Sequence, residues 1–596
     1  LMYTDNRTEI YIRGEEGALS TPPRIAEIAK EIEQTGIKGW DGLFWKNQYE
    51  AFQQFFHEKN LAPYFGSIDS LTRAMGDVSF DHQGRRIQGM RMQNTGDVYA
   101  VNGWEAMPYD NHSGIVDIYR NCKGNPSTFT YYTQPLYVAV SPRTQFVHLP
   151  GKVPVDFYIV NEKNLSGKYR LSVSVCTPDG KEGKHIEKEV HITGGDCFGQ
   201  LLLENCQLAI EGASGLYQVK AQLRNTSGHL CAEGKDEVLG IYWDEKQLKG
   251  KGALYGTPDD PVATFYQKAT GCELPAFRSD MEKLDWIVVT RSSLDAPQPV
   301  PVEAFCQKEG KSVLELSLYK DDDLRTLAGV TQDNKIDRTF ADGAQPDPLL
   351  PANQSFSAIW DGKLKAPQSG TYMIGVTSDQ GMRLSVNGQR IVDEWRNNKE
   401  LTVVRPFLLK AGDEVAVRVE YSQRNPTGSV QLVWSLPDHA AIAPQELLDR
   451  VREDGTSLLL LKSAESWMDA VSAYTGSAYH GYYSVGKNWV GGVHFVKEHP
   501  LFNGLPVNVA MGWPYQALVR NGDRRLGLHI DNEELVAGSY SSAPFNLGSA
   551  VGIISCGKGK IYYSTLDLVD NLNNPAAAAD VARKLFCNFI LLSKDR

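Results

Sequence analysis

The sequence predicts a multidomain chain that combines α/β regions with all-β regions. Residues 1–129 alternate strand patterns with helix patterns, and the same alternation recurs in residues 243–311 and 438–596. Residues 130–242 instead show short runs with apolar residues at every second position, which is typical of a β-sandwich. At 596 residues the chain is long enough for several domains of roughly 100–200 residues each.

The composition limits the classes of partner. Hydrophobic residues make up 42% of the chain and charged residues 22%, which are globular values. A net charge of -11 argues against nucleic acid or an anionic membrane surface as the partner. No apolar run approaches the ~20 residues of a membrane-spanning helix. The nine cysteines are scattered and contain no C-x-x-C pair, so we expect structural thiols rather than a metal or disulfide framework.

Residues 1–129 read as a strand, several helices and a second strand. We expect a strand at 9–13 that ends in the turn 14–18, G-E-E-G-A, and a helix that begins at the S-T-P-P of 20–23. Further helices are predicted at 45–59 and 83–93, followed by a closing strand at 98–102. In an α/β barrel the functional residues lie at the carboxyl ends of the strands, where this segment has Glu15, Glu16, Trp104 and Glu105.

The stretch after the second strand resembles the end of the barrel in glycoside hydrolase family 2. The similarity rests on Trp104, then Asn111-His112-Ser113-Gly114, then the basic segment that ends in Lys123. It implies the C-terminal part of a TIM (β/α)8 barrel in a retaining, β-galactosidase-like glycosidase. The earlier barrel strands would precede Leu1, so the missing N-terminal part of the barrel would be a partner, and this chain alone is expected to be inactive.

The same resemblance assigns candidate site residues. Glu15 falls on the family's nucleophile, and Glu16 beside it is the second candidate for that catalytic role. Trp104 would form the floor of the sugar pocket. Asn111 and His112 would contact sugar hydroxyls, and Glu105 is a further candidate for substrate binding. From the residues alone, two alternatives stay open: Glu15 and Glu16 as a solvated strand end, and the Asn111 turn as a local cap.

Two further residue patterns bear on this assignment. Ser113 stands where family members that cut uronic acids have a Lys, so we expect a neutral sugar, because a hydroxyl lacks the charge that binds a carboxylate. The family's general acid belongs to an Asn-Glu pair after an earlier barrel strand. The pairs Asn161-Glu162 and Asn532-Glu533 lie outside any barrel context and are interpreted as coincidental.

Residues 130–242 are predicted to form an immunoglobulin-like β-sandwich. Alternating runs such as 155–160 and 169–175 are separated by turns such as Pro178-Asp179-Gly180. We expect a structural role for this domain.

Residues 243–311 and 438–596 are predicted to form one interrupted α/β domain with a parallel sheet and helices on both faces. Its expected elements are listed in chain order: a strand at 252–255, helices at 261–270 and 302–308, a strand at 286–290, a helix at 444–453, strands at 458–461, 552–555 and 561–564, and a helix at 575–591. The domain resembles the flavodoxin-like fold of class I glutamine amidotransferases. No G-x-C-x-G elbow occurs, Cys306 falls in a predicted helix and Cys556 precedes a basic turn, so we expect it to be non-catalytic.

Residues 312–437 contain sequence motifs that resemble those of the PA14 domain, a β-sandwich of carbohydrate-active proteins. The motifs occur in the same order as in that family and include the segments 356–362, 369–372, 377–388 and 432–434. Some family members bind sugar through calcium held by an Asp-Asp pair. Here the pair is Asp379-Gln380, which lacks one charged oxygen ligand, so we expect no cofactor and disfavour calcium.

Taken together, the leading hypothesis is a retaining β-glycosidase that acts on an oligosaccharide or polysaccharide glycan. The alternative is a non-catalytic carbohydrate-binding or scaffold protein. An amidotransferase-like hydrolase is a third, which would need a reactive cysteine. The glycosidase resemblance implies a secreted, periplasmic or cell-surface bacterial protein, and the sequence leaves the sugar and its linkage open.

Overall fold

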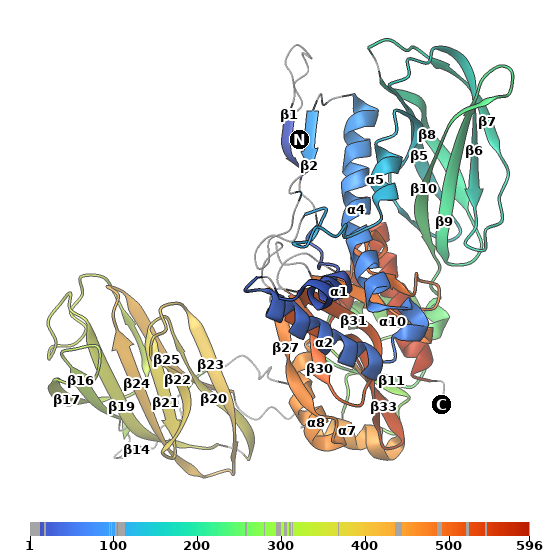
Figure 1. Cartoon of the computed structure of the whole chain (residues 1–596). Helices are drawn as coiled ribbons and strands as arrows, with labels where there is room; N and C mark the ends of the chain where they lie inside the picture. The colour runs from blue at the N-terminus through green and yellow to red at the C-terminus, as the bar shows by residue number, and fades with distance from the viewer. Residues whose placement is uncertain are drawn as a thin grey trace. The chain divides into compact units, whose positions relative to one another are not determined.

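The computed structural model describes residues 12–16, 19–37, 39–94, 96, 98–101, 104, 114–196, 198–256, 259–278, 280–293, 300–302, 307–308, 311–312, 314–367, 369–435, 444–485, 492–519, 524–542 and 545–594. The chain divides into a main unit, Leu1–Ser292 with Pro444–Arg596, and an inserted unit, Ser293–Ala443 (Figure 1). Strands predominate in both units.

The N-terminal part of the main unit contains a pair of parallel strands and the helices between them. β1 (Ile12–Glu16) pairs with β2 (Val98–Val101), and Ile12 lies opposite Val98. The connecting helices are α1 (Ile25–Thr35), α2 (Gly42–Glu58), α3 (Ala62–Phe65) and α4 (Ile68–Gln93).

Three predicted boundaries in this part were wrong. The strand continues to residue 16, so Glu15 and Glu16 lie within β1 and not in a turn that follows it. α1 begins after Arg24 rather than at residues 20–23, and Arg24 makes no side-chain capping bond. α4 begins well before residue 83, because the Ser67 hydroxyl accepts a hydrogen bond from the Ser70 N–H at 3.1 Å and caps the helix.

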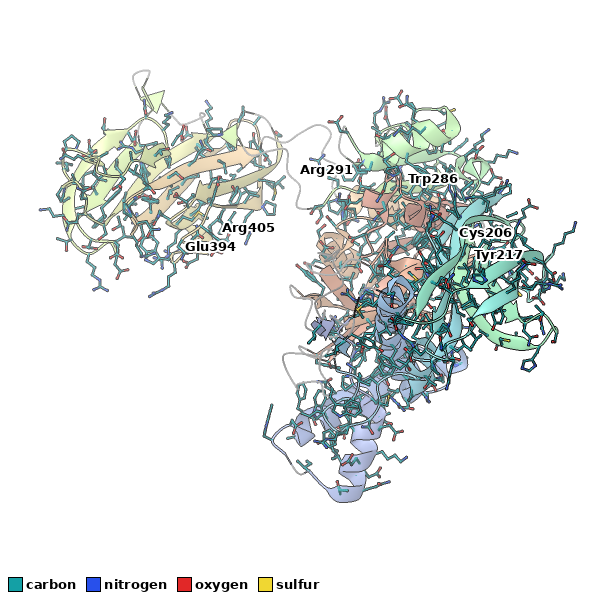
Figure 2. The ribbon with its side chains drawn as sticks, turned by 90° about the horizontal axis from the view of Figure 1, so that it is seen from above. Cys206, Tyr217, Trp286, Arg291, Glu394 and Arg405 are labelled. Atoms are coloured by element: carbon teal, nitrogen blue, oxygen red, sulfur yellow. The ribbon has the colours of Figure 1, made fainter. Side chains whose placement is uncertain are left out.

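The segment 130–242 forms two sheets, as its alternating pattern predicts. One has the order β4-β10-β9-β6-β7 and the other β3-β5-β8. The strands are β3 (Leu136–Pro142), β4 (Phe146–His148), β5 (Gly151–Asn161), β6 (Gly167–Cys176), β7 (Ile186–Ile192), β8 (Gly199–Ile210), β9 (Gly215–Arg224) and β10 (Leu230–Ile241). Their inward residues form one core, which includes Phe157 and Tyr217. Figure 2 labels Tyr217 among the strands of this segment. α5 (Pro126–Tyr132) leads from the N-terminal part into β3.

The second sheet system of the main unit is mixed rather than parallel, which corrects the prediction. β11 (Gly252–Tyr255), β12 (Trp286–Val289), β26 (Ser457–Leu460) and β33 (Gly559–Ser564) are parallel neighbours. β32 (Phe545–Cys556) then pairs antiparallel with β33. The reason is the short turn after Cys556, where Gly557 has φ +58° and an added Cβ would meet the Arg452 carbonyl oxygen at 2.5 Å.

The antiparallel half of this sheet continues beyond β32. Its strands are β31 (Glu534–Ser542), β28 (Gly492–Val496), β29 (Val509–Ala510), and β30 (Arg524–Ile530) with its partner β27 (Tyr479–Val485). The sheet therefore combines a parallel half, which follows the strand-helix alternation, with an antiparallel half that alternation alone does not predict.

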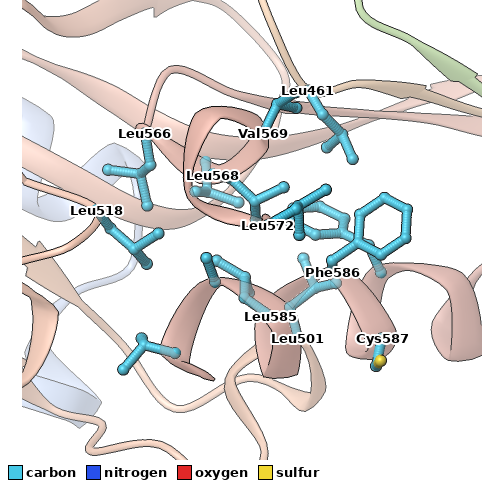
Figure 3. Packing of buried hydrophobic residues seen from close by; sticks show 14 of the residues in the cluster. Leu461, Leu501, Leu518, Leu566, Leu568, Val569, Leu572, Leu585, Phe586 and Cys587 are labelled. Carbon is cyan, nitrogen blue, oxygen red and sulfur yellow. The ribbon is translucent and has the colours of Figure 1, made fainter. Parts of the chain in front are cut away.

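Helices cover both faces of the mixed sheet. One face packs on α6 (Pro261–Thr270), α9 (Leu568–Asn571) and α10 (Asp580–Leu592) in a core that includes Leu568 and Phe586 (Figure 3). The opposite face, marked by Leu535, packs on α1, α2 and α4. α7 (Pro444–Asp449) precedes β26 of the parallel half, and α8 (Met468–Thr475) leads from β26 to β27 of the antiparallel half.

The inserted unit is a β-sandwich with its own core. One sheet, which we call the β19 sheet, has the order β17-β16-β19-β24-β21-β22, and the other has the order β13-β25-β20-β23 with β18 beside β25. The strands are β13 (Val300–Pro301), β16 (Leu314–Tyr319), β17 (Leu327–Asp333), β18 (Asp337–Phe340), β19 (Phe356–Lys365), β20 (Gly370–Ser378), β21 (Gly381–Val386), β22 (Gln389–Glu394), β23 (Leu401–Leu409), β24 (Glu414–Gln423) and β25 (Gly428–Ser435). Trp360, Tyr372 and Tyr421 are fully buried between the sheets.

The helix predicted for residues 302–308 was also wrong. Gln307–Lys308 forms strand β14, which pairs antiparallel with β15 (Lys311–Ser312). Cys306 lies outside the described residues. The pattern of polar and apolar residues in this segment fits a helix face and a strand equally well. The run is too short to distinguish the 3.6-residue period of a helix from the two-residue period of a strand.

Candidate functional site

The strands that carry the predicted catalytic residues are parallel neighbours. Glu15 and Glu16 lie in β1, and Glu16 is opposite Val101 of β2 in the strand register. Trp104 follows β2, its side chain is 65% exposed, and its carbonyl oxygen accepts a hydrogen bond from the Val116 N–H at 2.9 Å. The side chains of Glu15 and Glu16 are not among those described, so a common cavity with Trp104 stays a prediction.

The remaining predicted substrate residues, Glu105, Asn111 and His112, lie outside the described residues. The chain that follows them is well anchored. A β-bridge joins Val116 to Cys122, and the Asn125 N–H donates to Asp77 of α4 at 2.5 Å. The loop after β2 is thus fixed to α4 at the point where the candidate segment ends.

A partly buried group of charges connects this loop to the chain that follows β1. The Arg24 side chain donates to both carboxylate oxygens of Asp69 at 2.6 Å and to the Cys122 carbonyl oxygen at 2.9 Å. The Arg24 N–H donates to Asp117 at 3.1 Å. The segments behind the two predicted catalytic strands are therefore held against each other by one arginine.

Lys123 and Asp117 complete this group. The Lys123 ammonium is fully buried and donates to the Thr21 carbonyl oxygen at 2.9 Å. Burial lowers the pKa of Lys123 to about 7 and raises the pKa of Asp117 to about 6. Desolvation thus dominates both groups, and the arrangement is better explained as a structural junction than as a ligand site.

The two Asn-Glu pairs contribute ion pairs. Glu162 accepts from Arg91 at 2.5 Å beside a hollow of about 250 Å³, which Tyr99 of β2 also lines. The Glu533 side chain is 0% exposed and accepts from Lys59, the residue that follows α2, at 2.9 Å. Both carboxylates neutralise a buried or partly buried base, which gives each a structural role.

The inserted unit has a larger hollow at one end of its sandwich. It has a volume of about 450 Å³ and lies between residues 341–355, which join β18 to β19, and residues 423–426 at the end of β24. Its polar lining consists of Asp342, Asn353, Gln354, Ser355, Gln423, Arg424 and Asn425. Phe340 and Phe356 form an aromatic pair with centroids 5.0 Å apart on its inner side. The sequence predicts none of these residues, although the polar turn 422–428 between two alternating runs is a signal that could locate them.

Internal hydrogen bonds hold the wall of this hollow in place. The Arg424 guanidinium donates to Asp322 at 3.1 Å and to the Trp395 carbonyl oxygen at 2.7 Å. The Gln423 amide donates to the Asn425 carbonyl oxygen at 2.9 Å and accepts from the buried Tyr421 hydroxyl. A wall fixed in this way can present polar groups without reorganising.

The adjacent Asp379-Gln380 pair does not fit calcium. Asp379 Oδ1 accepts from the Ser429 N–H at 2.7 Å. The Gln380 amide oxygen accepts from the Arg424 and Asn425 N–H groups, and its amide nitrogen donates to the Thr427 carbonyl oxygen at 3.1 Å. Gln380 thus supplies a neutral amide whose oxygen faces N–H donors, whereas calcium prefers several charged oxygens. Among the described residues, no group of three or more His, Cys, Asp and Glu could hold a metal ion.

The thiols of the described part of the chain are free. They are Cys122, Cys176, Cys206, Cys231, Cys272, Cys556 and Cys587. Burial raises the pKa of Cys556 at the end of β32 and raises that of Cys587 to about 12. Neither thiol has the lowered pKa of a nucleophile. Among the helices that the structure describes, none is long and apolar enough to cross a bilayer.

Parts of the chain are similar to known proteins. The anti-sigma-I factor RsgI3 of Acetivibrio thermocellus is 29% identical over 117 residues, which are 20% of this chain and 18% of that protein. The structure of β-glucosidase from Kluyveromyces marxianus in complex with glucose matches 37% of this chain and 29% of its own, with 16% identity and a TM-score of 0.20. The PA14 sugar-binding domain of an RTX adhesin matches 20% of this chain and 87% of its own, with 19% identity and a TM-score of 0.17. The chain thus spans less than a fifth of RsgI3 and less than a third of the β-glucosidase.

The sequence family of the inserted unit is established by a match to the PA14 domain over residues 310–447. The predicted range, 312–437, lies within the matched one. The chain therefore carries a PA14 domain at residues 310–447.

Proposed function

We propose that the PA14 domain binds a glycan in the hollow between residues 341–355 and 423–426. The observation that carries this proposal is a hollow of about 450 Å³ that combines amides, a carboxylate and a guanidinium with an aromatic pair. Small-molecule sites typically have volumes of about 300–1,000 Å³ and a few fixed polar groups over an apolar base. Sugar hydroxyls can donate to Asp342 and accept from Arg424 and the amides. The apolar face of a sugar ring suits the partly exposed ring of Phe340, which packs on the buried Phe356.

Loss of the Asp342 carboxylate is expected to weaken this binding roughly 10- to 100-fold, because a hydrogen bond to a charged group contributes about 1.5–3 kcal/mol. The measurement is titration calorimetry of Asp342→Ala with a glycan that the wild-type chain retains on a glycan array. EDTA should leave the affinity unchanged, since the Gln380 amide is occupied by backbone groups.

The control is Asn398→Ala, which removes an exposed side chain of the same domain that does not line the hollow. Equal affinity of the Asp342→Ala and Asn398→Ala chains would rule out the hollow as the site. So would failure of the wild-type chain to retain any glycan. A loss of affinity in EDTA would contradict the metal-independent arrangement.

A second proposal is family-2-type β-glycosidase activity on a neutral sugar, most like that of a β-galactosidase. It is favoured by the parallel pairing of β1 with β2, which places the backbone of Glu15 and Glu16 beside the strand that precedes Trp104. Glu15 would attack the anomeric carbon, and a second carboxyl about 5–5.5 Å away would act as acid and then as base. The resemblance assigns that second carboxyl to a barrel strand before β1.

The activity predicts covalent labelling of Glu15. A protein that carries this chain is incubated with 2,4-dinitrophenyl 2-deoxy-2-fluoro-β-galactoside, which traps the glycosyl-enzyme, and its peptides are analysed by mass spectrometry. We expect the label on Glu15 and its loss in Glu15→Gln, whereas the matched change Glu16→Gln should retain it. Labelling of Glu16 instead would overturn the assignment of the nucleophile, and no turnover of any aryl β-glycoside would favour the scaffold alternative.

A further inference from the structure

The exposed face of the β19 sheet carries a continuous row of polar side chains. Glu315 of β16 lies opposite Asp361 of β19, which lies opposite Arg418 of β24. Arg418 in turn lies opposite Ser385 of β21, and Ser385 opposite Arg390 of β22. Neighbouring strands are about 4.8 Å apart, so the row crosses the sheet over a length that suits an oligosaccharide better than a single sugar.

A hollow of about 540 Å³ lies along this row. It exists because small residues, Gly362, Gly388 and Ala416, stand beside the long side chains of the row and leave space above the backbone. Glu315, Asp361, Lys363, Ser385 and Arg418 also line it. The charges of its two acidic residues, Glu315 and Asp361, balance those of its two basic residues, Lys363 and Arg418. A lining without net charge suits a neutral polyol better than a polyanion.

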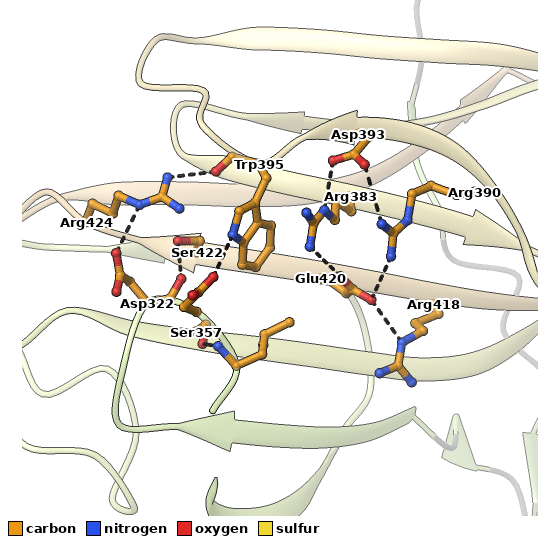
Figure 4. Close-up of polar contacts among 12 residues, drawn as sticks. Asp322, Ser357, Arg383, Arg390, Asp393, Trp395, Arg418, Glu420, Ser422 and Arg424 are labelled. Atoms are coloured by element: carbon orange, nitrogen blue, oxygen red, sulfur yellow. Dashed lines mark hydrogen bonds and ion pairs between the residues drawn. The ribbon is translucent and has the colours of Figure 1, made fainter. Parts of the chain in front are cut away.

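The charged side chains of the row are held in place before any ligand arrives. Arg418 donates to Asp361 at 2.8 Å. It also donates to Glu420 at 3.3 Å (Figure 4). The Glu420 side chain is only 10% exposed and also pairs with Arg383 at 3.4 Å and Arg390 at 3.5 Å. Arg418 and Asp361 each remain 43% exposed, so both can still bond a hydroxyl group in the hollow.

Trp395 fixes the far side of this network. The Arg383 guanidinium lies 4.4 Å from the centre of the indole ring, and Arg383 also pairs with Asp393 at 2.8 Å. The indole N–H is directed to Asp323 at 3.4 Å. Because Arg383 is held by the ring as well as by two carboxylates, the position of Glu420, and through it that of Arg418, is set by packing as well as by charge.

We propose that this groove is a second carbohydrate site, which takes several consecutive residues of a neutral glycan chain. It rests on the glycan binding proposed above and adds a class of ligand, an extended oligosaccharide, that the hollow at the end of the sandwich does not require. Paired carboxylate and guanidinium groups can bond adjacent hydroxyls of successive sugar residues, and the small-residue floor lets the chain approach the sheet.

The test uses the full chain with β-1,4-galactohexaose, xylohexaose and cellohexaose, and with galactose, xylose and glucose, in titration calorimetry. Arg418→Ala is expected to weaken hexasaccharide binding about tenfold and to leave monosaccharide binding unchanged. Ala416→Trp fills the groove without removing an ion pair and should have the same effect. Ala411→Trp, at an exposed turn position that does not line the groove, is the matched control.

Each pattern of results decides between the two sites. If Asp342→Ala weakens hexasaccharide binding and both groove variants bind as the wild type does, the groove proposal is overturned and the first site stands. If only the groove variants lose affinity, the groove stands and the first site fails. No hexasaccharide binding by the wild-type chain, or equal binding by all variants, overturns the groove. Unchanged melting temperatures show that the groove variants are folded.

Discussion

Replacing Lys59 with Met is expected to lower the free energy of unfolding of the main unit by about 3–5 kcal/mol. Lys59 is the cation that faces Glu533, whose side chain is 0% exposed and also accepts from the Ser549 and Tyr563 hydroxyls. Without the ammonium, the buried carboxylate loses its ion-pair partner. Urea unfolding followed by tryptophan fluorescence measures the loss.

The same substitution at Lys46 is the control. Lys46 lies on α2, the helix that Lys59 follows. Its side chain is 54% exposed and its pair with Glu50 spans 3.9 Å, so Lys46→Met should change the stability by less than about 1 kcal/mol. Adding Glu533→Gln to Lys59→Met removes the buried charge and keeps an acceptor oxygen for one of the two hydroxyls, so it should recover part of the loss. A Lys59→Met protein as stable as the control would show that the pair does not support the helix-to-sheet junction.

Trp360→Ala is expected to destabilise the PA14 domain by about 3–5 kcal/mol. Trp360 is fully buried between the two sheets, and its indole N–H donates to Asp333 at 3.0 Å. The change leaves a large cavity and a carboxylate that loses a donor. In calorimetry we expect the transition of the inserted unit to fall by roughly 6–20 °C, with the transition of the main unit unchanged, since this core consists of residues 302–434.

Leu408→Ala is the matched comparison for this domain. Leu408 is 77% exposed on β23, so truncating it should have little effect on the melting temperature. If Trp360→Ala shifts both transitions equally, the two units do not unfold independently. If it shifts neither, the packing between the sheets contributes less than its burial implies.

Local patterns predicted individual elements better than their arrangement. The helix at 261–270 and the strand at 252–255 have the predicted ends, because a Pro in the first turn and short apolar runs mark them locally. The parallel sheet was predicted from the same alternation, yet its second half is antiparallel. A short turn such as the one at Gly557 reverses the chain direction and so makes the next strand antiparallel. The periodicity of strands and helices in the sequence carries no information about this direction.

The candidate site could be predicted only where its residues are close in sequence. The PA14 motifs located a domain that the family match then confirmed. The hollow itself is formed by two loops separated by β19 to β24, and the contact of Lys59 with Glu533 joins residues 474 positions apart. Contacts between residues so far apart in the chain depend on how sheets and helices pack, and this packing could not be predicted from local sequence patterns. The interpretation of Asn532-Glu533 as coincidental missed the structural role of Glu533, which pairs with Lys59.

The helices between β1 and β2 cover the face of the mixed sheet marked by Leu535, Tyr540 and Leu547. The first hundred residues and the last hundred thus share one hydrophobic core and are expected to fold together, although the sequence assigns them to different domains. A truncated protein that begins at residue 130 would expose that apolar surface to water and would leave Glu533 without Lys59, its ion-pair partner. Transfer of the mixed-sheet domain to another protein would therefore require both the N-terminal helices and the C-terminal strands to be transferred.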